Sequence, residues 1–421
     1  MSLFECKAVI PLSVFLVCLA AACGGDSPLG PGPSLSGLPR ALSQEETLLI
    51  EAGNDFSFRF LRESYEADPT SNLFLAPLSA SMALGMTLNG ASGNTYQEMR
   101  ETLGFGTLSL EGINQGYRDL MDLLMDLDPR VEMGVGNSIW YREGFSVRDD
   151  FLDRMERYFD ALIRALDFSD PEAPGVINGW VRDRTRGRIK EIVDPPISPS
   201  TVMFLINATY FKAKWTHRFD KGKTSQAEFF RQDGTSSPVP LMEITDTVPY
   251  TETEVYQAVD LPYGGGAFSL TVLLPKGGET VQSLVEALSR SSWAEMVGNL
   301  EEREGTAQLP RFRMEWGKLL NETLQGMGMV DAFLPGVADF SGLSDDALAM
   351  GLFVSKVKQK SFVDVNEEGT EAAGATMVQI DRSALPDRFI FRADHPFIFV
   401  IRERFSGTVL FVGVFMEPPE A

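Results

Sequence analysis

The chain has 421 residues, of which 44% are hydrophobic and 23% are charged, and its formal net charge at pH 7 is −22. This composition is typical of a globular protein, and the length suffices for one large domain or two ordinary ones. The negative charge disfavours nucleic-acid backbones and anionic lipid surfaces as general partners.

Residues 1–22 predict a cleaved export signal. Ala8 to Ala22 is almost wholly apolar, follows Lys7, and is too short to span a bilayer comfortably as a helix. The run LAAAC ending at Cys23 resembles the lipobox of bacterial lipoproteins, although Ala20 occupies the position where Leu is most common. The resemblance implies that Cys23 is lipidated and anchors the exported protein to the membrane of the cell envelope. The alternative is an ordinary signal peptide and a secreted protein.

Residues 23–42 predict a flexible tether. Asp26 to Arg40, DSPLGPGPSLSGLPR, is rich in Pro, Gly and Ser. Because Cys6 and Cys18 would leave with the signal, Cys23 is the only cysteine that remains. A disulfide within the mature chain is therefore excluded.

A single folded domain is predicted for residues 43–421, because no second linker of this kind and no internal repeat follows. Ser43 and Glu46 have the spacing of a capping box and predict the first helix. One face of that helix is apolar at helical spacing and would face a core. It carries Leu49, Ala52, Phe56 and Phe60.

Helices and strands are mixed along the rest of the chain. Thr95 is predicted to cap a helix, because Glu98 follows three residues later, and Gly104 is predicted to end it. A second helix is predicted by an apolar face that comprises Phe151, Met155, Phe159 and Leu162. Strands are predicted for Val131 to Tyr141, Thr201 to Phe211, Ala267 to Pro275 and Ser361 to Val365. The last third is dominated by strands. This pattern predicts an α+β fold rather than a regular βαβ alternation.

The sequence offers little catalytic chemistry. It contains no HExxH, no Cys/His cluster with metal spacing, no phosphate-binding Gly loop and no GxSxG elbow. The two histidines, His217 and His395, are expected to be structural. A Ser-His-Asp arrangement could be assembled on paper, as in almost any chain of this size, so we expect no enzyme, no metal and no cofactor.

An unusual segment begins at Asn366, where NEEGTEAAGATMVQIDRSALPD places small residues in a region that would form a loop. If the segment is a strand, one face carries Thr370, Ala372, Gly374, Thr376, Val378 and Ile380. The other face carries Glu371, Ala373, Ala375, Met377, Gln379 and Asp381, and with them every formal charge. A small-residue helix is the alternative, which Gly369 and Gly374 weaken but do not exclude. Composition alone does not decide between the two.

The chain from about Ser43 to Pro418 resembles a serpin. NEEGTEAAGAT (Asn366 to Thr376) is similar to the serpin hinge, and FRADHPFIFVIRE (Phe391 to Glu403) to the segment that follows the reactive loop. Further matches occur in family order. They are NLFLAPLSASMALGMTLNGASGNT (72–95), INGWVRDRTRGRI (177–189), NATYFKAKW (207–215), LPYGGGAFSLTVLLP (261–275) and LPRF (309–312). The resemblance implies three β-sheets, about nine helices and an exposed reactive-centre loop at about residues 367–390.

The resemblance also implies a mechanism and a partner. A target serine protease attacks the loop, forms an acyl-enzyme, and is trapped covalently when the cleaved loop inserts into the main sheet as a new strand. The hinge residues implied are Glu367, Gly369, Thr370, Glu371, Ala372, Ala373, Gly374, Ala375 and Thr376. Their small side chains fit the inhibitory pattern, whereas family members that act as carriers or chaperones often lose it. We expect a monomer that needs no cofactor and binds no nucleic acid.

The position of the scissile bond depends on loop length. The commonest serpin count from Gly369 gives Ser383-Ala384, and a loop one residue shorter gives Arg382-Ser383. We prefer Arg382, because an arginine can pair with the buried carboxylate of a trypsin-like protease. The alternative is that Arg382 is a solvated loop residue and that Ser383 or Leu385 serves an elastase-like or chymotrypsin-like target.

Two control regions are implied by the resemblance. Trp215 and the pair Arg311 and Glu367 correspond to the breach at the top of the main sheet. Ser79, Asn207 and Gln359 correspond to the shutter near its middle. The chain departs from the family pattern at Gln359, where many serpins have His, and at Ala76, which is usually Ser. These two departures predict a shutter whose hydrogen-bond geometry differs from the family pattern.

Overall fold

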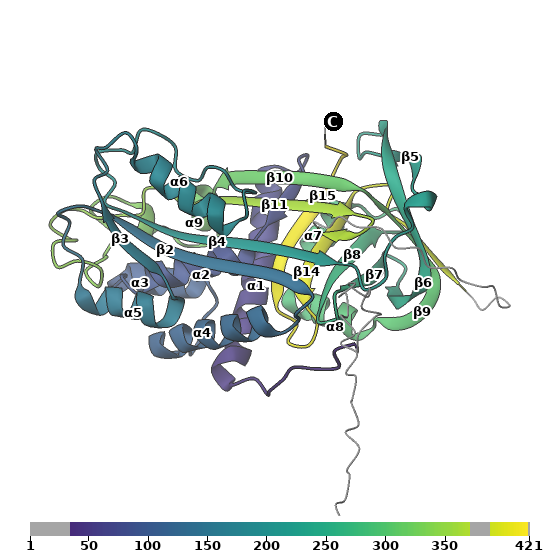
Figure 1. Cartoon of the computed structure of the whole chain (residues 1–421), viewed down its shortest axis with the longest axis horizontal. Helices are drawn as coiled ribbons and strands as arrows, with labels where there is room; N and C mark the ends of the chain where they lie inside the picture. Colours follow the sequence, from purple (N-terminus) through teal and green to yellow (C-terminus); the bar gives the residue numbers. More distant parts are fainter. Residues whose placement is uncertain (1–33, 371–387, 420–421) are drawn as a thin grey trace, which may run out of the picture. The chain divides into compact units, whose positions relative to one another are not determined.

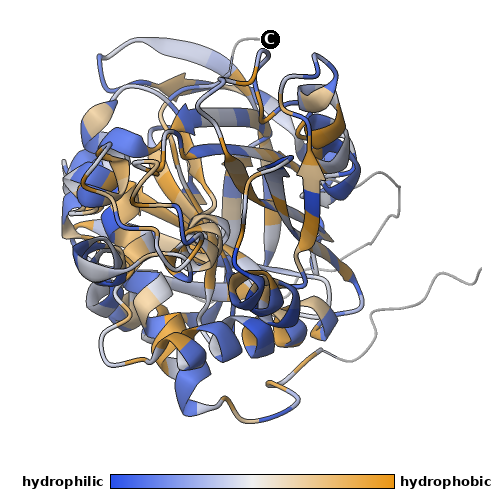
Figure 2. Ribbon diagram, turned by 90° about the vertical axis from the view of Figure 1, so that its left-hand side faces the viewer, coloured by the Kyte–Doolittle hydropathy of each residue, from blue (hydrophilic) through white to orange (hydrophobic). Residues whose placement is uncertain are grey.

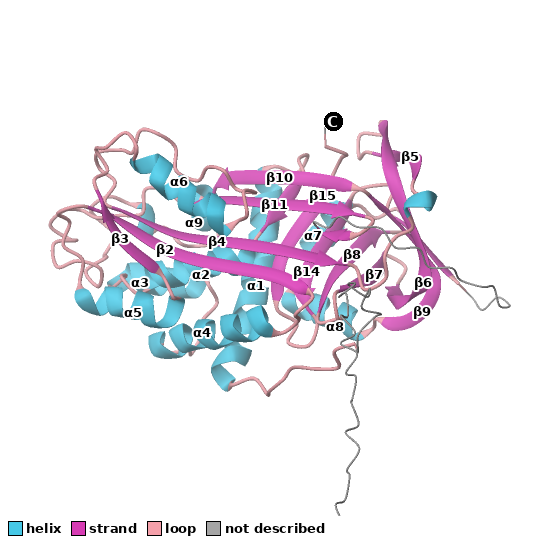
Figure 3. Ribbon diagram, viewed as in Figure 1, coloured by secondary structure: helices cyan, strands magenta, loops and turns pink. Residues whose placement is uncertain are grey.

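Two β-sheets and nine α-helices organise residues 34–370 and 388–419, which are the residues that the computed structural model describes (Figures 1 and 3). The helices are α1 (Gln44–Ala67), α2 (Pro77–Leu88), α3 (Gly93–Thr102), α4 (Leu110–Asp126), α5 (Asp149–Phe159), α6 (Ala173–Arg184), α7 (Val281–Ala287), α8 (Arg290–Gly298) and α9 (Asn321–Gly326). Two short 3₁₀ helices are η1 (Lys221–Lys223) and η2 (Asp331–Phe333). The α+β class and the expected number of helices are confirmed.

The six-stranded sheet has the strand order β10-β11-β12-β4-β2-β3. Its strands are β2 (Val131–Arg142), β3 (Leu162–Leu166), β4 (Met203–Lys214), β10 (Phe312–Leu319), β11 (Lys358–Asn366) and β12 (Gly369–Thr370). The two residues of β12 pair antiparallel with β11 on one side and with β4 on the other. Beyond these two residues, no backbone pairing joins β4 directly to β11 within the described residues. We call this boundary between β4 and β11 the seam.

The nine-stranded sheet has the order β1-β15-β14-β8-β7-β6-β9-β13, and β5 pairs with β6 beside this path. Its strands are β1 (Leu73–Leu75), β5 (Ser225–Phe230), β6 (Ser236–Glu252), β7 (Tyr256–Tyr263), β8 (Phe268–Pro275), β9 (Glu301–Pro310), β13 (Phe389–Arg392), β14 (Phe397–Glu403) and β15 (Val409–Phe415). The expected second and third sheets are continuous here, because the long strand β6 pairs with β5 and β9 and, at its end, with β7.

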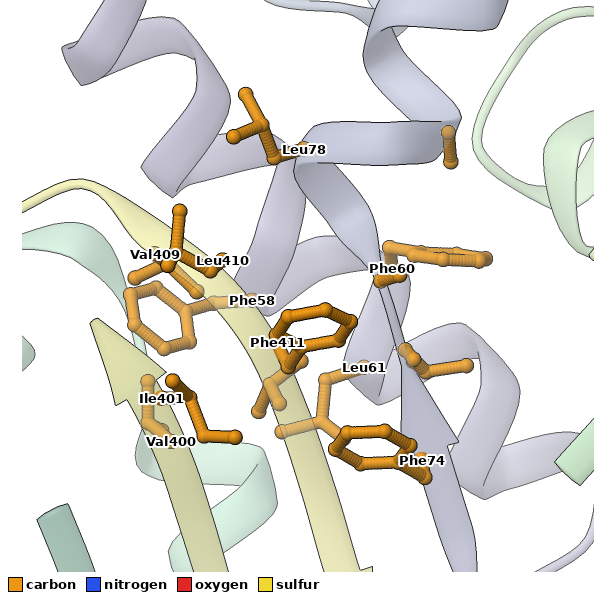
Figure 4. Close-up of a cluster of buried hydrophobic side chains, with 14 of the residues drawn as sticks. Phe58, Phe60, Leu61, Phe74, Leu78, Val400, Ile401, Val409, Leu410 and Phe411 are labelled. Atoms are coloured by element: carbon orange, nitrogen blue, oxygen red, sulfur yellow. The ribbon is translucent and has the colours of Figure 1, made fainter. Parts of the chain in front are cut away.

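The core lies between the two sheets and the helices around α1. Side chains from α1, β1, α2, β14 and β15 pack together in it (Figure 4), and Phe74 stacks on Phe399 and Phe411 with ring centroids 5.7 and 5.2 Å apart. Hydrophobic residues are concentrated in the strands, whereas the outer faces of the helices are hydrophilic (Figure 2). A smaller cluster, including Trp140 and Ile177, packs α6 against the opposite face of the six-stranded sheet. The six-stranded sheet, which contains the seam, therefore packs on the main hydrophobic core with one face.

Most predicted elements are present, with two local corrections. Ser43 caps α1 and forms the capping box with Glu46, as predicted. The start of α3 was placed wrongly, because Ser92 is the N-cap residue and Thr95 lies inside the helix, where its hydroxyl accepts a hydrogen bond from Asp339 N–H at 3.0 Å. Leu162 does not belong to the face of α5, since the helix ends at Phe159 and Leu162 begins β3 with an exposed side chain.

Part of the predicted tether contacts the domain. Leu35 N–H donates to Gly265 O at 2.7 Å, and the side chains of Leu35, Leu38 and Leu42 pack against the core. Arg40 forms two 2.7 Å hydrogen bonds with Glu46. Residues 34–42 therefore pack against the domain and are not part of a flexible tether. The prediction missed this because it weighed the Pro, Gly and Ser residues and not the leucines among them. The signal segment and Cys23 lie outside the described residues.

Among the described residues, no helix is both long and apolar enough to cross a membrane.

Candidate functional site

The hinge enters the seam at Gly369 and Thr370. Gly369 has a φ of +148°, and a Cβ at this position would lie 2.1 Å from Ala213 O, so only glycine fits. Thr370 is 2% exposed, and its hydroxyl forms a 2.7 Å hydrogen bond with the Tyr263 hydroxyl. Burial raises the pKa of Tyr263 well above its usual value, which keeps this hydroxyl neutral.

The remaining hinge residues, Glu371, Ala372, Ala373, Gly374, Ala375 and Thr376, lie outside the described residues. The candidate scissile-bond residues Arg382, Ser383 and Ala384 do so as well. The structure therefore leaves open whether the segment from Glu371 onward is a strand or a helix, and both candidate bonds remain predictions.

Trp215, which the resemblance assigns to the breach, contacts the segment that leads into β12. It is 3% exposed and stacks on Tyr263 with ring centroids 4.4 Å apart. Its backbone N–H donates to Glu368 O at 3.0 Å, and its indole Nε1–H donates to Asn366 O at 2.8 Å. Trp215 thus holds the backbone that leads into the hinge at two points.

The carboxylates of Glu367 and Glu368 are both buried and meet half-exposed cations. Arg311 lies 3.5 Å from Glu367, which also accepts a 2.8 Å hydrogen bond from the Thr224 hydroxyl. Lys221 lies 2.7 Å from Glu368. The structure brings the predicted pair of Arg311 and Glu367 together, whereas sequence reasoning missed the shorter contact of Lys221 with Glu368. Each pair with a solvent-exposed cation is worth about 0–1 kcal/mol.

At the shutter, a chain of amides and hydroxyls links α2 to the six-stranded sheet. Ser79 Oγ–H donates to Asn207 Oδ1, and Asn207 Nδ2–H donates to Asn137 Oδ1 at 2.8 Å. Asn137 in turn donates to Phe159 O at 2.6 Å. The structure therefore brings Ser79 and Asn207 together, with Asn207 on the β4 side of the seam.

Gln359 secures the other side of the seam. Its Nε2–H donates to Ala76 O at 2.9 Å, and its Oε1 accepts from Ala76 N–H at 3.1 Å. This two-bond pairing uses only the backbone of Ala76, so a hydroxyl at that position is not required. Ser361 adds a hydrogen bond from its hydroxyl to Phe74 O, which sequence reasoning did not identify. Although residues 76 and 359 depart from the family pattern, their hydrogen bonds still connect β11 to the segment before α2.

The connection after α6 contacts strands on both sides of the seam. Arg186 lies over the ring of Tyr210 in β4 at 5.4 Å and forms a 2.6 Å ion pair with Glu132 in β2. Arg188 lies over the ring of Phe362 in β11 at 4.9 Å. These contacts cover the outer face of the seam, and no sequence signal identified them because cation–π partners are set by tertiary structure.

Both histidines pair with aspartates. His217 Nδ1 lies 2.8 Å from Asp246, and His395 Nδ1 lies 3.0 Å from Asp394. Within residues 34–370 and 388–419, no group of three or more His, Cys, Asp or Glu side chains is arranged to hold a metal ion.

The comparisons with known proteins identify the family. The family model described as Serpin (serine protease inhibitor) matches residues 51–418, so the chain belongs to the serpin family. It is 36% identical to an uncharacterized serpin-like protein of Thermococcus kodakarensis over 89% of this chain and 87% of that protein.

Two solved structures are also similar. Native Tengpin, a thermophilic serpin, is 31% identical with a TM-score of 0.81 over 91% of this chain and 96% of that chain. Thyroxine-binding globulin in complex with thyroxine is 27% identical with a TM-score of 0.79 over 88% of this chain and 99% of that chain. The serpin fold expected from the sequence is confirmed.

Proposed function

We propose that this protein is a suicide-substrate inhibitor of serine proteases. The protease attacks the reactive loop, forms an acyl-enzyme, and is trapped when the loop enters the seam between β4 and β11. The protein is consumed in the reaction and is therefore not an enzyme. Its partner is the target protease in covalent complex, and it acts as a monomer without a cofactor.

The pairing of β12 is the observation that carries the proposal. Gly369 and Thr370 already form a two-residue strand between β11 and β4, at the one end of the seam where the reactive loop begins. Since β12 runs antiparallel to both neighbours, a continuation of the same strand would pair with β11 and β4 down the seam. Among the described residues, β12 is thus a started strand, and no other strand lies between β4 and β11.

Insertion of a serpin reactive loop is an established case of strand addition, and its driving force can be bounded. About a dozen inserted residues, each gaining backbone hydrogen bonds worth about 0.5–1.5 kcal/mol net, contribute on the order of ten kcal/mol. The uninserted protein is then metastable. The trap works because insertion outruns hydrolysis of the acyl-enzyme.

We place the scissile bond at Arg382-Ser383, with Ser383-Ala384 as the alternative. An arginine before the bond suits a trypsin-like specificity pocket with a buried carboxylate. Both bonds lie outside the described residues, so the support for Arg382 is its residue type, whereas the commonest loop length favours Ser383-Ala384.

The test is to mix the chain without its signal segment with trypsin, elastase, chymotrypsin and subtilisin in separate reactions. Denaturing gels detect a covalent complex at the summed mass, and mass spectrometry of the released C-terminal peptide identifies the bond. We expect a complex with trypsin and a peptide that starts at Ser383. A peptide that starts at Ala384 would move the bond by one residue. Cleavage without any complex would contradict inhibition.

A carrier function is the second candidate, because the fold is similar to thyroxine-binding globulin in complex with thyroxine. A carrier would leave all four proteases free and would melt at a higher temperature in the presence of its ligand. The gel assay for a covalent complex separates the two functions before any ligand is known.

We also propose that the protein is exported and anchored through a lipid on Cys23. The support is the sequence LAAAC and the apolar run before it. An ordinary signal peptide would instead give a secreted inhibitor.

A further inference from the structure

The two ends of the reactive loop are anchored differently. The N-terminal end is held by β12, which pairs on both sides. The C-terminal end continues into β13, a four-residue strand at the edge of the nine-stranded sheet, which pairs only with β9. β13 is therefore held to its sheet along one side only.

Chain length makes β13 the obstacle to insertion of an uncleaved loop. About 18 residues separate Thr370 from Phe389. If about a dozen of them entered the seam, as the proposed function requires, they would extend about 40 Å at about 3.3 Å per residue, and the remaining six would reach back only about 20 Å. An intact loop can therefore insert fully only if β13 leaves β9.

His395 ties the connection after β13 to strand β8, which is the partner of β14 in the sheet. It lies in the connection between β13 and β14, with Nδ1 3.0 Å from Asp394 Oδ1 and Nε2 3.1 Å from Pro275 O at the end of β8. Asp394 also pairs with Arg392, the last residue of β13, at 2.8 Å. Asp394, His395 and Pro275 therefore form a bridge from β13 to β8.

Both ring nitrogens of His395 face acceptors. A carbonyl oxygen and an ionised carboxylate can only accept hydrogen bonds, and a neutral imidazole has one N–H to donate. Only the imidazolium form satisfies Asp394 and Pro275 together. Loss of one proton must therefore break one of the two hydrogen bonds, whichever tautomer results.

We propose that His395 is a proton-dependent clasp on β13: its imidazolium form holds the strand in place, and deprotonation loosens it, so that the intact protein converts to a loop-inserted, inactive form faster as the pH rises. This inference rests on the proposed loop-insertion function and specifies its regulation.

The charges around His395 support the sign of this effect. Burial lowers the pKa of His395, but the hydrogen bonds to Asp394 and Pro275 and the charge of Asp394 outweigh burial, and the pKa lies above its usual value of 6.5. A raised folded pKa contributes stability below the unfolded pKa, and this stability is lost as the pH rises through the folded pKa.

Among the described residues, the groups that contact the clasp from neighbouring elements are two backbone groups and the guanidinium of Arg392. From β8 comes the neutral Pro275 carbonyl, and β5 donates Phe230 N–H to Asp394 O at 2.8 Å. From β13, Arg392 pairs with Asp394 and with Gln308 of β9. The remaining histidine, His217, belongs to the segment after β4 and pairs with Asp246, near Glu302, so it serves as a matched control.

The test compares the wild type with His395→Gln and His217→Gln. Each protein is incubated between pH 5.5 and 8.5 at constant ionic strength and returned to one pH, and the remaining capacity for covalent complex formation is measured on gels. We expect the wild type to lose capacity roughly tenfold more slowly at pH 5.5 than at pH 8.5, which corresponds to about 1.4 kcal/mol. His395→Gln should lose this dependence, and His217→Gln should retain it.

The outcomes separate the clasp from the inhibitor function. Absence of a complex at zero time would refute inhibition, and the clasp would then be judged by NMR titration of the two histidine rings, assigned with the His217→Gln protein. A His395 pKa at or below 6.5, or an unchanged pH profile in His395→Gln, would overturn the clasp. The titration uses a folded protein even if His395→Gln does not fold.

Discussion

Replacing Thr370 with arginine tests whether the hinge must occupy the seam. Thr370 is buried between Val365 of β11 and Ala213 of β4, and its hydroxyl bonds to Tyr263. An arginine there would lose that hydrogen bond and would bury a guanidinium beside a neutral phenol. Because Thr370 already sits in the seam before cleavage, the substitution acts on the native protein as well as on the inserted one.

The expected magnitude follows from burial of an unpaired charge, which costs about 3–5 kcal/mol. We expect the arginine to push β12 out of the seam in the native protein, so that the cost is met only when insertion brings the hinge back. At about 1.4 kcal/mol for each factor of ten, even the lower value then slows that step by about 100-fold. Hydrolysis of the acyl-enzyme would then overtake insertion. The protein should become a substrate, with many molecules cleaved for each protease inactivated.

The assay is the stoichiometry of inhibition, measured by titrating a fixed amount of trypsin and checking for the covalent band. Thr370→Ser keeps the hydroxyl and the small size and is the matched control, which should remain an inhibitor. If Thr370→Arg trapped trypsin at the wild-type stoichiometry, the reasoning that the hinge enters the seam would be refuted.

Three further substitutions test the other parts of the proposal. Arg382→Ala should abolish capture of trypsin while leaving the melting temperature unchanged, and undiminished capture would place the scissile bond elsewhere. Gln359→Ala removes both hydrogen bonds to Ala76 and should lower the unfolding free energy by about 1–3 kcal/mol, as measured in denaturant; an unchanged value would show that Gln359 is not a latch. Cys23→Ser should release the protein from the membrane fraction, and its retention there would exclude lipid anchoring.

Local signals account for how much of the fold could be predicted. The first helix was predictable because Ser43 and Glu46 cap each other within four residues, and β8 because apolar residues dominate its sequence. The start of α3 was not, since Ser92 makes no side-chain capping bond and Thr95 satisfies a distant backbone N–H instead. The seam itself is a long-range feature that the sequence pattern of neither strand reveals.

Some contacts around β12 were predictable from the family pattern. The resemblance pointed to Arg311, Glu367 and Trp215, and the structure places them around the hinge. It could not point to Lys221, which reaches Glu368 from a turn after β4 and has no local signature. The resemblance also could not predict that the Gln359 side chain would pair with the backbone of Ala76. That pairing depends on how close β11 lies to the segment before α2.

The ion pairs and hydrogen bonds around the seam are too weak to determine whether the loop is finally inserted. They can only affect the rate of insertion. The ion pairs of Glu367 and Glu368 involve exposed cations and contribute about 0–1 kcal/mol each. The hydrogen bonds of Gln359 and Ser79 contribute about 1 kcal/mol each. Under the proposed insertion mechanism, filling the seam is worth on the order of ten kcal/mol by the same measure. If the proposal holds, the native protein therefore persists through a barrier, to which the contacts of Trp215 before the loop and the pairing of β13 after it would both contribute.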